Sequence, residues 1–200
     1  MVLSLMPLAA QATNNTLLVL GDSLSAAHNL PIDQGWVSLL EQRLASADHD
    51  WQVVNASISG ETSGGGAARI SELLDQHQPQ ALIVELGGND GLRGLPLGQF
   101  RDNLATIIGQ ARQAGVNVLL VGIDIPTNYG VAYRRRFSEV YTRLAEEFHV
   151  PLVPFLLEGV ALQPDLMQAD GIHPTAAAQP MILDNLWPYL RDLLELDETP

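Results

Sequence analysis

The sequence predicts an α/β fold in which one parallel β-sheet is covered by helices on both faces. Short apolar segments of strand length alternate with longer segments of helical periodicity along the chain. One short segment, 81–86, is apolar at nearly every position, as expected for a strand that is buried on both faces. The chain has 200 residues and no internal repeat or low-complexity linker, so we expect a single domain.

Five segments have the features of strands, because each is a short apolar run that ends in residues favouring turns. The expected strands are 17–20, 51–55, 81–86, 116–122 and 150–155. Proline interrupts the last of them, and proline is better tolerated at the edge of a sheet than in its centre. We therefore place 150–155 at an edge.

The segments between these strands are predicted to form helices, because apolar residues recur in each at helical spacing and form one stripe. The expected helices start near Trp36, cover about 67–77, about 99–114 and 137–148, and run from the 170–174 loop to about residue 195. Pro180 and Pro188 are expected to bend or break the last helix.

The composition excludes several classes of function. All 10 basic residues are arginine, so the chain cannot form a lysine Schiff base, anchor pyridoxal phosphate or build a lysine-containing phosphate-binding loop. With 23 acidic residues the net charge is −13, which opposes binding to nucleic acid and to anionic membranes. There is no cysteine, and no two of the 5 histidines have metal-ligand spacing, so we predict neither a metal site nor a cofactor.

The amino-terminal residues have the features of an export signal. Residues 2–10 are apolar, and Ala10-Gln11-Ala12 has the small-x-small pattern of a cleavage site. The stretch is too short to span a bilayer, so no stable membrane insertion is expected. Because the usual basic segment is missing, a cytosolic protein with an apolar leader stays open. We interpret residues 1–12 as the remnant of a signal peptide, followed by a single domain over 13–200 in a periplasmic or secreted protein.

A serine follows the first predicted strand directly. Gly21-Asp22-Ser23 ends the apolar run, so Ser23 is expected at the carboxyl end of that strand, where open α/β sheets bind ligands. The alternative is an ordinary turn that leads into a helix N-cap. Asp170 and His173 occupy one later loop, and their spacing allows the carboxylate to orient the imidazole as a base for Ser23.

Donors for a developing oxyanion are expected at the same edge. The loops after the first three strands meet there and carry Ser23, Gly60 and Asn89. The backbone N–H groups of Ser23 and Gly60 and the side-chain amide of Asn89 would form an oxyanion hole. In the alternative interpretation Gly60 only serves a turn, Asn89 braces its own loop, and His173 caps the last helix.

These residues fall within four sequence blocks that resemble those of the SGNH (GDSL-type) hydrolases, in the order of that family. The blocks are Gly21-Asp22-Ser23-Leu24, Gly60 within 55–62, Gly87-Gly88-Asn89-Asp90 and Asp170-Gly171-Ile172-His173. The longer strings 55–62 and 85–93 are most similar to the bacterial thioesterase I, lysophospholipase and arylesterase group.

The resemblance implies a flavodoxin-like three-layer α/β/α sandwich with a five-stranded parallel sheet. It also implies a serine esterase or thioesterase in which Ser23 is the nucleophile, His173 the base and Asp170 the orienting acid, with Gly60 and Asn89 as oxyanion donors. It further implies export to the periplasm, in agreement with the amino-terminal pattern.

The substrate is expected to be a small acyl ester or thioester, such as an aryl ester, an acyl-CoA type thioester or a lysophospholipid. Its acyl chain needs an apolar trough, for which two loops are candidates, although both could instead pack under their own loops. The candidate residues are Leu92, Leu95, Pro96, Phe155 and Leu157.

Two other functions stay open at this point. A carbohydrate O-deacetylase would use the same triad. A non-catalytic flavodoxin-like module would instead bind phosphate with Ser63-Gly64-Gly65-Gly66 and the Gly21 turn, and would leave Asp170 and His173 without a use. The three consecutive arginines at 134–136 are interpreted as part of a solvent-exposed helix face. The sequence carries no indication of oligomeric state.

Overall fold

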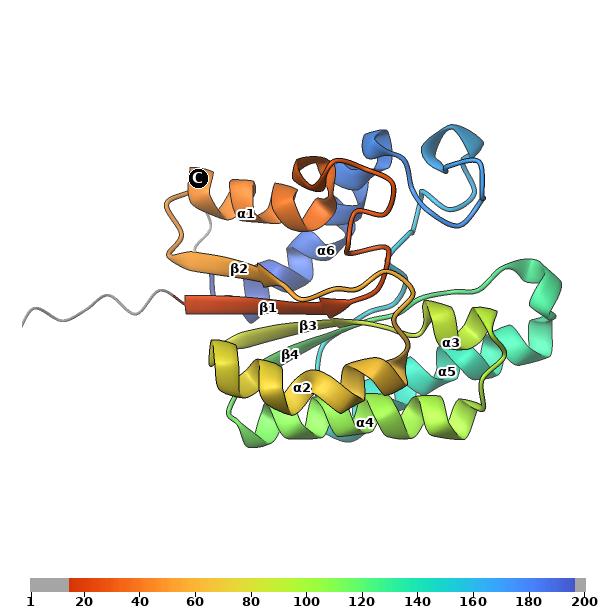
Figure 1. Ribbon diagram of the computed structural model, residues 1–200, viewed down its shortest axis with the longest axis horizontal. Helices are drawn as coiled ribbons and strands as arrows, with labels where there is room; N and C mark the ends of the chain where they lie inside the picture. Colours follow the sequence, from red (N-terminus) through yellow and green to blue (C-terminus); the bar gives the residue numbers. More distant parts are fainter. Residues whose placement is uncertain (1–14, 197–200) are drawn as a thin grey trace, which may run out of the picture.

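The computed structural model describes residues 15–196, which form three layers around a five-stranded parallel sheet (Figure 1). The strands lie in the order β2-β1-β3-β4-β5, which is the flavodoxin-like order. Their bounds are Asn15–Gly21 for β1, Trp51–Asn55 for β2, Ala81–Glu85 for β3, Asn117–Val121 for β4 and Leu152–Val153 for β5. The predicted fold class is therefore confirmed.

Helices cover both faces of the sheet. Helices α1 (Trp36–Ser46) and α6 (Gln179–Leu193) pack against each other on one face. Helices α2 (Ser63–His77), α4 (Leu97–Gln113) and α5 (Val131–Phe148) cover the other face, and the short helix α3 (Gly88–Leu92) lies near the carboxyl end of β3 (Figure 1). All strands point toward the same edge, where the loops that carry the candidate site residues gather.

Strand β5 lies at an edge of the sheet, as predicted, but it is shorter than the predicted segment 150–155. It forms only the pairs Leu120–Leu152 and Val121–Val153 with β4. Pro151 and Pro154 flank these two residues and have no N–H to continue the ladder. Beyond the strand, the backbone of Pro154 still lies close to that of Gly122, because a Cβ at Gly122 would lie 2.3 Å from the carbonyl oxygen of Pro154.

An aromatic cluster supports the turn after β3. The rings of Phe100 and Phe137 stack with centroids 4.9 Å apart, and Tyr141 meets both edge-on. The Tyr141 hydroxyl donates a hydrogen bond of 2.9 Å to the carbonyl of Leu86. Gly87 follows with φ of +132°, and a Cβ there would lie 2.2 Å from that hydroxyl oxygen, so only glycine fits. The buried cluster thereby fixes the chain just before Asn89.

Helix α2 begins at Ser63, earlier than the predicted start near residue 67. Thr62 caps it by accepting a 3.4 Å hydrogen bond from the N–H of Gly65. The N–H of Ser63 donates at 2.8 Å to the buried carboxylate of Asp90. The glycine run 64–66 thus lies in the first turn of α2, where Asp90 and Thr62 engage the N–H groups of Ser63 and Gly65.

The glycine-rich segment after β3 forms the short helix α3 from Gly88. The expectation for the prolines of the last helix needs correction. Neither Pro180 nor Pro188 breaks α6. Pro180 occupies the first turn, where its missing N–H has no helical acceptor, and the helix continues through Pro188 to Leu193.

The interpretation of residues 1–12 as a signal-peptide remnant lies outside the described residues. Within 15–196, no helix is both long enough and apolar enough to cross a membrane.

Candidate active site

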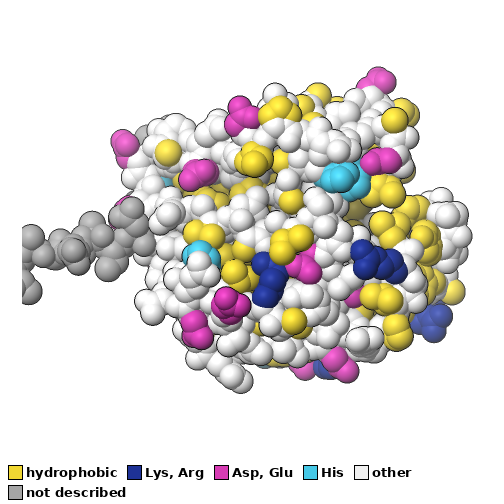
Figure 2. Space-filling view, in the orientation of Figure 1, with side chains coloured by type: hydrophobic (Ala, Val, Ile, Leu, Met, Phe, Trp, Pro, Cys, Tyr) yellow, Lys and Arg dark blue, Asp and Glu magenta, His cyan; other side chains and the backbone are white. Residues whose placement is uncertain are grey.

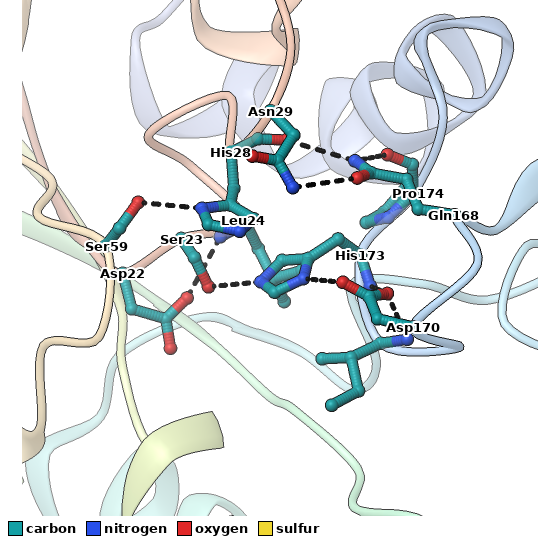
Figure 3. Close-up of polar contacts among 11 residues, drawn as sticks. Asp22, Ser23, Leu24, His28, Asn29, Ser59, Gln168, Asp170, His173 and Pro174 are labelled. Atoms are coloured by element: carbon teal, nitrogen blue, oxygen red, sulfur yellow. Dashed lines mark hydrogen bonds and ion pairs between the residues drawn. The ribbon is translucent and has the colours of Figure 1, made fainter.

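The structure brings Ser23, His173 and Asp170 together at the carboxyl edge of the sheet (Figure 3). Ser23 lies two residues beyond the end of β1, and its Oγ is 2.8 Å from Nε2 of His173. The Nδ1 atom of the same ring is 2.7 Å from Oδ2 of Asp170. Ser23 and His173 are 150 residues apart in the sequence, so the fold and not local structure creates this contact.

The loop that carries His173 is organised by Asp170. Its Oδ1 accepts hydrogen bonds from the N–H groups of Ile172 at 2.9 Å and His173 at 3.0 Å. These bonds, with the His173 backbone bond contributing most, hold the pKa of Asp170 well below its usual value. A carboxylate only accepts hydrogen bonds, so the His173 proton belongs on Nδ1, and Nε2 is left to accept the proton of the Ser23 hydroxyl.

Asn89 lies in α3, close to the serine. Its Nδ2 donates a 3.0 Å hydrogen bond to Oδ2 of Asp22, the residue before Ser23. A side-chain amide carries two donor hydrogens, so one remains for a ligand. The contact with Asp22 fixes the direction of the amide.

Gly60 lies in the loop after β2. That loop is tied to the end of β1, because the N–H of Ile58 donates to the carbonyl of Gly21 at 3.1 Å. On its other side, Arg93 donates at 2.9 Å to the carbonyl of Gly60. Gly60 has φ of +83°, which favours glycine. The predicted oxyanion donors therefore come from two loops and helix α3, all at one edge of the sheet.

Two buried carboxyl groups lie beneath the serine turn. Glu85 is fully buried, and its Oε2 accepts hydrogen bonds from the Ser25 hydroxyl at 2.6 Å and the Asp22 N–H at 3.3 Å. Burial raises the pKa of Glu85 well above its usual value, and the nearby charge of Asp22 adds to the shift. Burial also raises the pKa of Asp22 from 3.8 to about 6, although hydrogen bonds from Leu24 and Asn89 oppose the shift.

Sequence reasoning missed three residues of this region. In the sequence, Glu85 is recognisable only as an acidic residue at the end of an apolar strand. His28 and Gln168 gave no signal, because each lies in a polar loop and matters only through contacts that the fold creates. The His28 ring lies against that of His173, and Gln168 hydrogen-bonds to the backbone of both loops (Figure 3).

The candidate acyl-chain residues occupy different environments. Leu92 and Leu95 are half-buried and Pro96 is exposed. Phe155 lines an open cavity of about 390 Å³ between the ends of β4 and β5, together with Ile123 and Val131. Leu157 is only 6% exposed and belongs to the core.

In the space-filling view, hydrophobic side chains gather at the right-hand end of the molecule, beside a histidine (Figure 2). Within the run 134–136, Arg135 and Arg136 are exposed, as expected for a solvated helix face, whereas Arg134 is half-buried and pairs with Asp124. Arg134 also lines the cavity that contains Phe155.

The chain is similar to known proteins over most of its length. The sequence profile of the GDSL-like Lipase/Acylhydrolase family matches residues 19–179. Esterase TesA of Pseudomonas aeruginosa is 53% identical over 192 residues, which cover 96% of each chain. Thioesterase 1/protease 1/lysophospholipase L1 of Escherichia coli is 47% identical over 186 residues, covering 93% of this chain and 88% of the relative. A crystal structure of TesA superposes with a TM-score of 0.88 at 54% identity, covering 90% of this chain and 99% of that one.

Proposed function

This chain belongs to the GDSL-like lipase/acylhydrolase family, and from that membership we propose that it hydrolyses acyl esters and thioesters through a triad of Ser23, His173 and Asp170. The observation that carries the assignment of residues is the 2.8 Å contact between Ser23 Oγ and His173 Nε2. A serine hydroxyl is a weak nucleophile at neutral pH, and a base within hydrogen-bond distance activates it.

In the acylation step, Ser23 Oγ attacks the carbonyl carbon and its proton passes to Nε2 of His173. The Asp170 carboxylate stabilises the imidazolium that forms. The tetrahedral intermediate then expels the alcohol or thiol, which takes the proton from His173. An acyl group remains bound to Ser23.

In the deacylation step, water replaces the leaving group. His173 takes a proton from the water molecule, which attacks the acyl carbon, and then returns the proton to Ser23 Oγ. The carboxylic acid is released and the enzyme is regenerated.

The negative charge on the carbonyl oxygen is stabilised by the N–H groups of Ser23 and Gly60 and by the Asn89 amide. Asp22 supports this role of Asn89, since its contact with one amide hydrogen orients the amide and leaves the other hydrogen for the oxyanion. Asp22 is only 2% exposed, so water does not compete for this contact.

The test uses Ser23→Ala with Ser71→Ala as its control, because Ser71 is exposed on α2. We expect Ser23→Ala to lose turnover of p-nitrophenyl butyrate and covalent labelling by an organophosphonate ester, and Ser71→Ala to keep both. Mass spectrometry of the labelled peptide locates the phosphonate. Labelling of another residue, or turnover by folded Ser23→Ala, contradicts the assignment.

The substrate class is inferred from the relatives, which include an esterase and a protein named as both thioesterase and lysophospholipase. A panel of p-nitrophenyl acyl esters, acyl-CoA thioesters, lysophosphatidylcholine and acetylated sugars tests it. We expect turnover of the esters and thioesters. Turnover confined to the acetylated sugars would favour the deacetylase alternative.

We also propose that the protein is exported to the periplasm or secreted. The support is the apolar segment 2–10 and the pattern Ala10-Gln11-Ala12. Amino-terminal sequencing of the protein recovered from a periplasmic fraction is expected to find a start after Ala12. An intact Met1 in the cytosolic fraction contradicts export.

A further inference from the structure

A second histidine lies against the base of the proposed triad. The ring centroids of His28 and His173 are 4.2 Å apart, and the ring planes are inclined by 35° (Figure 3). His28 lies on the polar loop after β1, whereas His173 comes from the loop before α6. The mechanism described above uses only His173, so this contact has no role in it.

Gln168 fixes the two histidine loops to each other. Its Nε2 donates to the carbonyl of His28 at 3.0 Å and to that of Pro174 at 2.9 Å. Its backbone N–H donates to the carbonyl of His173 at 2.7 Å. One side chain and its own backbone therefore hold His28 beside His173, and the ring contact does not depend on two independently mobile loops.

The backbone of His28 is also tied to the nucleophile. The N–H of His28 donates to the carbonyl of Ser23 at 3.3 Å. On the far side, Nδ1 of His28 lies 3.4 Å from the Ser59 hydroxyl, one residue before Gly60. The 3.4 Å hydroxyl contact is at the long end for a hydrogen bond, so we take the packing of the ring on His173 as the main contact of the His28 side chain.

The position of the ring matters because His173 is held at its edge by only two atoms. Asp170 holds Nδ1, and Ser23 is the proton donor at Nε2. The imidazole turns about its Cβ–Cγ bond, and both hydrogen bonds act in the plane of the ring, so they oppose a small out-of-plane tilt only weakly. The His28 ring, with its centroid 4.2 Å away on one face, opposes tilting toward that side.

We propose that His28 is a positioning residue, whose ring keeps the His173 imidazole in the plane that it needs to accept the Ser23 proton. The inference rests on the proposed triad. It concerns the ring face of His28 and not its proton, so a phenylalanine at this position can take over the function.

The experiment compares His28→Ala, which removes the ring, with His28→Phe, which keeps an aromatic face but cannot bond to Ser59. We expect His28→Ala to lower kcat for p-nitrophenyl butyrate about tenfold with KM within about twofold, and His28→Phe to restore kcat to within about threefold of the wild type. The rate of phosphonate labelling of Ser23 is expected to follow kcat.

His77→Ala is the matched control. His77 ends α2, which starts at the edge of the sheet that carries the site and therefore ends at the opposite edge. The kcat of His77→Ala is expected to equal that of the wild type. Thermal unfolding of each variant verifies folding, and His28→Leu replaces His28→Ala in the comparison if the alanine variant does not fold.

Three outcomes overturn the inference: a kcat of folded His28→Ala within twofold of the wild type, a kcat of His28→Phe as low as that of His28→Ala, or a rise in KM with kcat unchanged. Failure of the triad itself is distinguishable, because Ser23→Ala would then retain turnover whatever residue stands at position 28.

Discussion

The carboxylate of Asp170 holds both the backbone and the ring of His173. Its Oδ1 accepts from the His173 N–H at 3.0 Å, and its Oδ2 lies 2.7 Å from Nδ1 of the imidazole. The bond to the backbone fixes where the base lies, and the bond to the ring fixes which nitrogen faces Ser23. One side chain therefore sets the position and the tautomer of the base.

Replacing this carboxylate tests both functions. In Asp170→Asn the amide presents one oxygen in place of two, so the ring and the backbone N–H groups compete for it. We expect kcat for p-nitrophenyl butyrate to fall by about 10²–10⁴ with the fold retained. Asp165→Asn is the control, because Asp165 is exposed in the same loop region. Activity of Asp170→Asn within tenfold of the wild type would show that another group orients the base.

Removing the Asn89 amide tests the oxyanion hole. We expect Asn89→Ala to lower kcat by about 10²–10³, because the donor acts on charge that develops in the transition state. KM is expected to change little. Asn117→Ala serves as the control, since Asn117 is exposed at the start of β4, at the opposite edge of the sheet. A change in KM alone would assign Asn89 to substrate binding.

The pKa of Asp22, raised by burial from 3.8 to about 6, predicts a pH-dependent stability. Because the folded state has the higher pKa, it binds the proton more tightly than the unfolded state does. The contribution of Asp22 to the free energy of unfolding therefore falls by about 3 kcal/mol as pH rises from about 4 to 6, and it is constant above that window.

Asp22→Asn isolates the contribution, since the amide keeps the shape of the side chain and does not ionise. Relative to the wild type, its free energy of unfolding in urea is expected to rise by about 3 kcal/mol between pH 4 and pH 7. A difference that is independent of pH would mean that Asp22 titrates near its ordinary value in the folded protein.

Leu95 and Leu157 are candidates from two different loops for lining the acyl trough. Because they differ in burial, we expect their replacement to have different effects. Leu157 is 6% exposed, so Leu157→Ala is expected to lower the free energy of unfolding by about 2–5 kcal/mol. Leu95 is half-buried, so Leu95→Ala is expected to change the preference among p-nitrophenyl esters of different chain length with little loss of stability. If Leu157→Ala changes that preference and Leu95→Ala does not, the trough lies beside β5.

The strands and the gathering of Ser23, Gly60 and Asn89 at one edge could be predicted because both follow from regular features. The meeting of Ser23 with His173 was indicated by the base that a serine nucleophile needs and by the resemblance to the SGNH hydrolases. Apolar runs mark the strands, and parallel strands bring their carboxyl ends to one edge, so residues far apart in the sequence are placed together without knowledge of any single contact. Local spacing added the link between Asp170 and His173. These features need no information about side-chain packing.

The residues that sequence analysis missed depend on such packing. His28 acquires its partner only when the loop before α6 folds over the loop after β1, and no periodicity reports that event. The early start of α2 was missed because glycine disfavours helices. Here Gly66 is required by close packing, since a Cβ would lie 2.4 Å from Leu86 Cδ1.

The shortness of β5 bears on how the enzyme loses activity on heating. Two residue pairs join β5 to the sheet, whereas β1 and β3 lie at its centre and pair with each other over five residues. Segments with few backbone hydrogen bonds open at a lower free energy than the central strands, as amide hydrogen exchange detects. We therefore expect heating to inactivate the enzyme through a sub-global opening, in which imidazole and hydroxyl separate while the central strands are still protected from exchange.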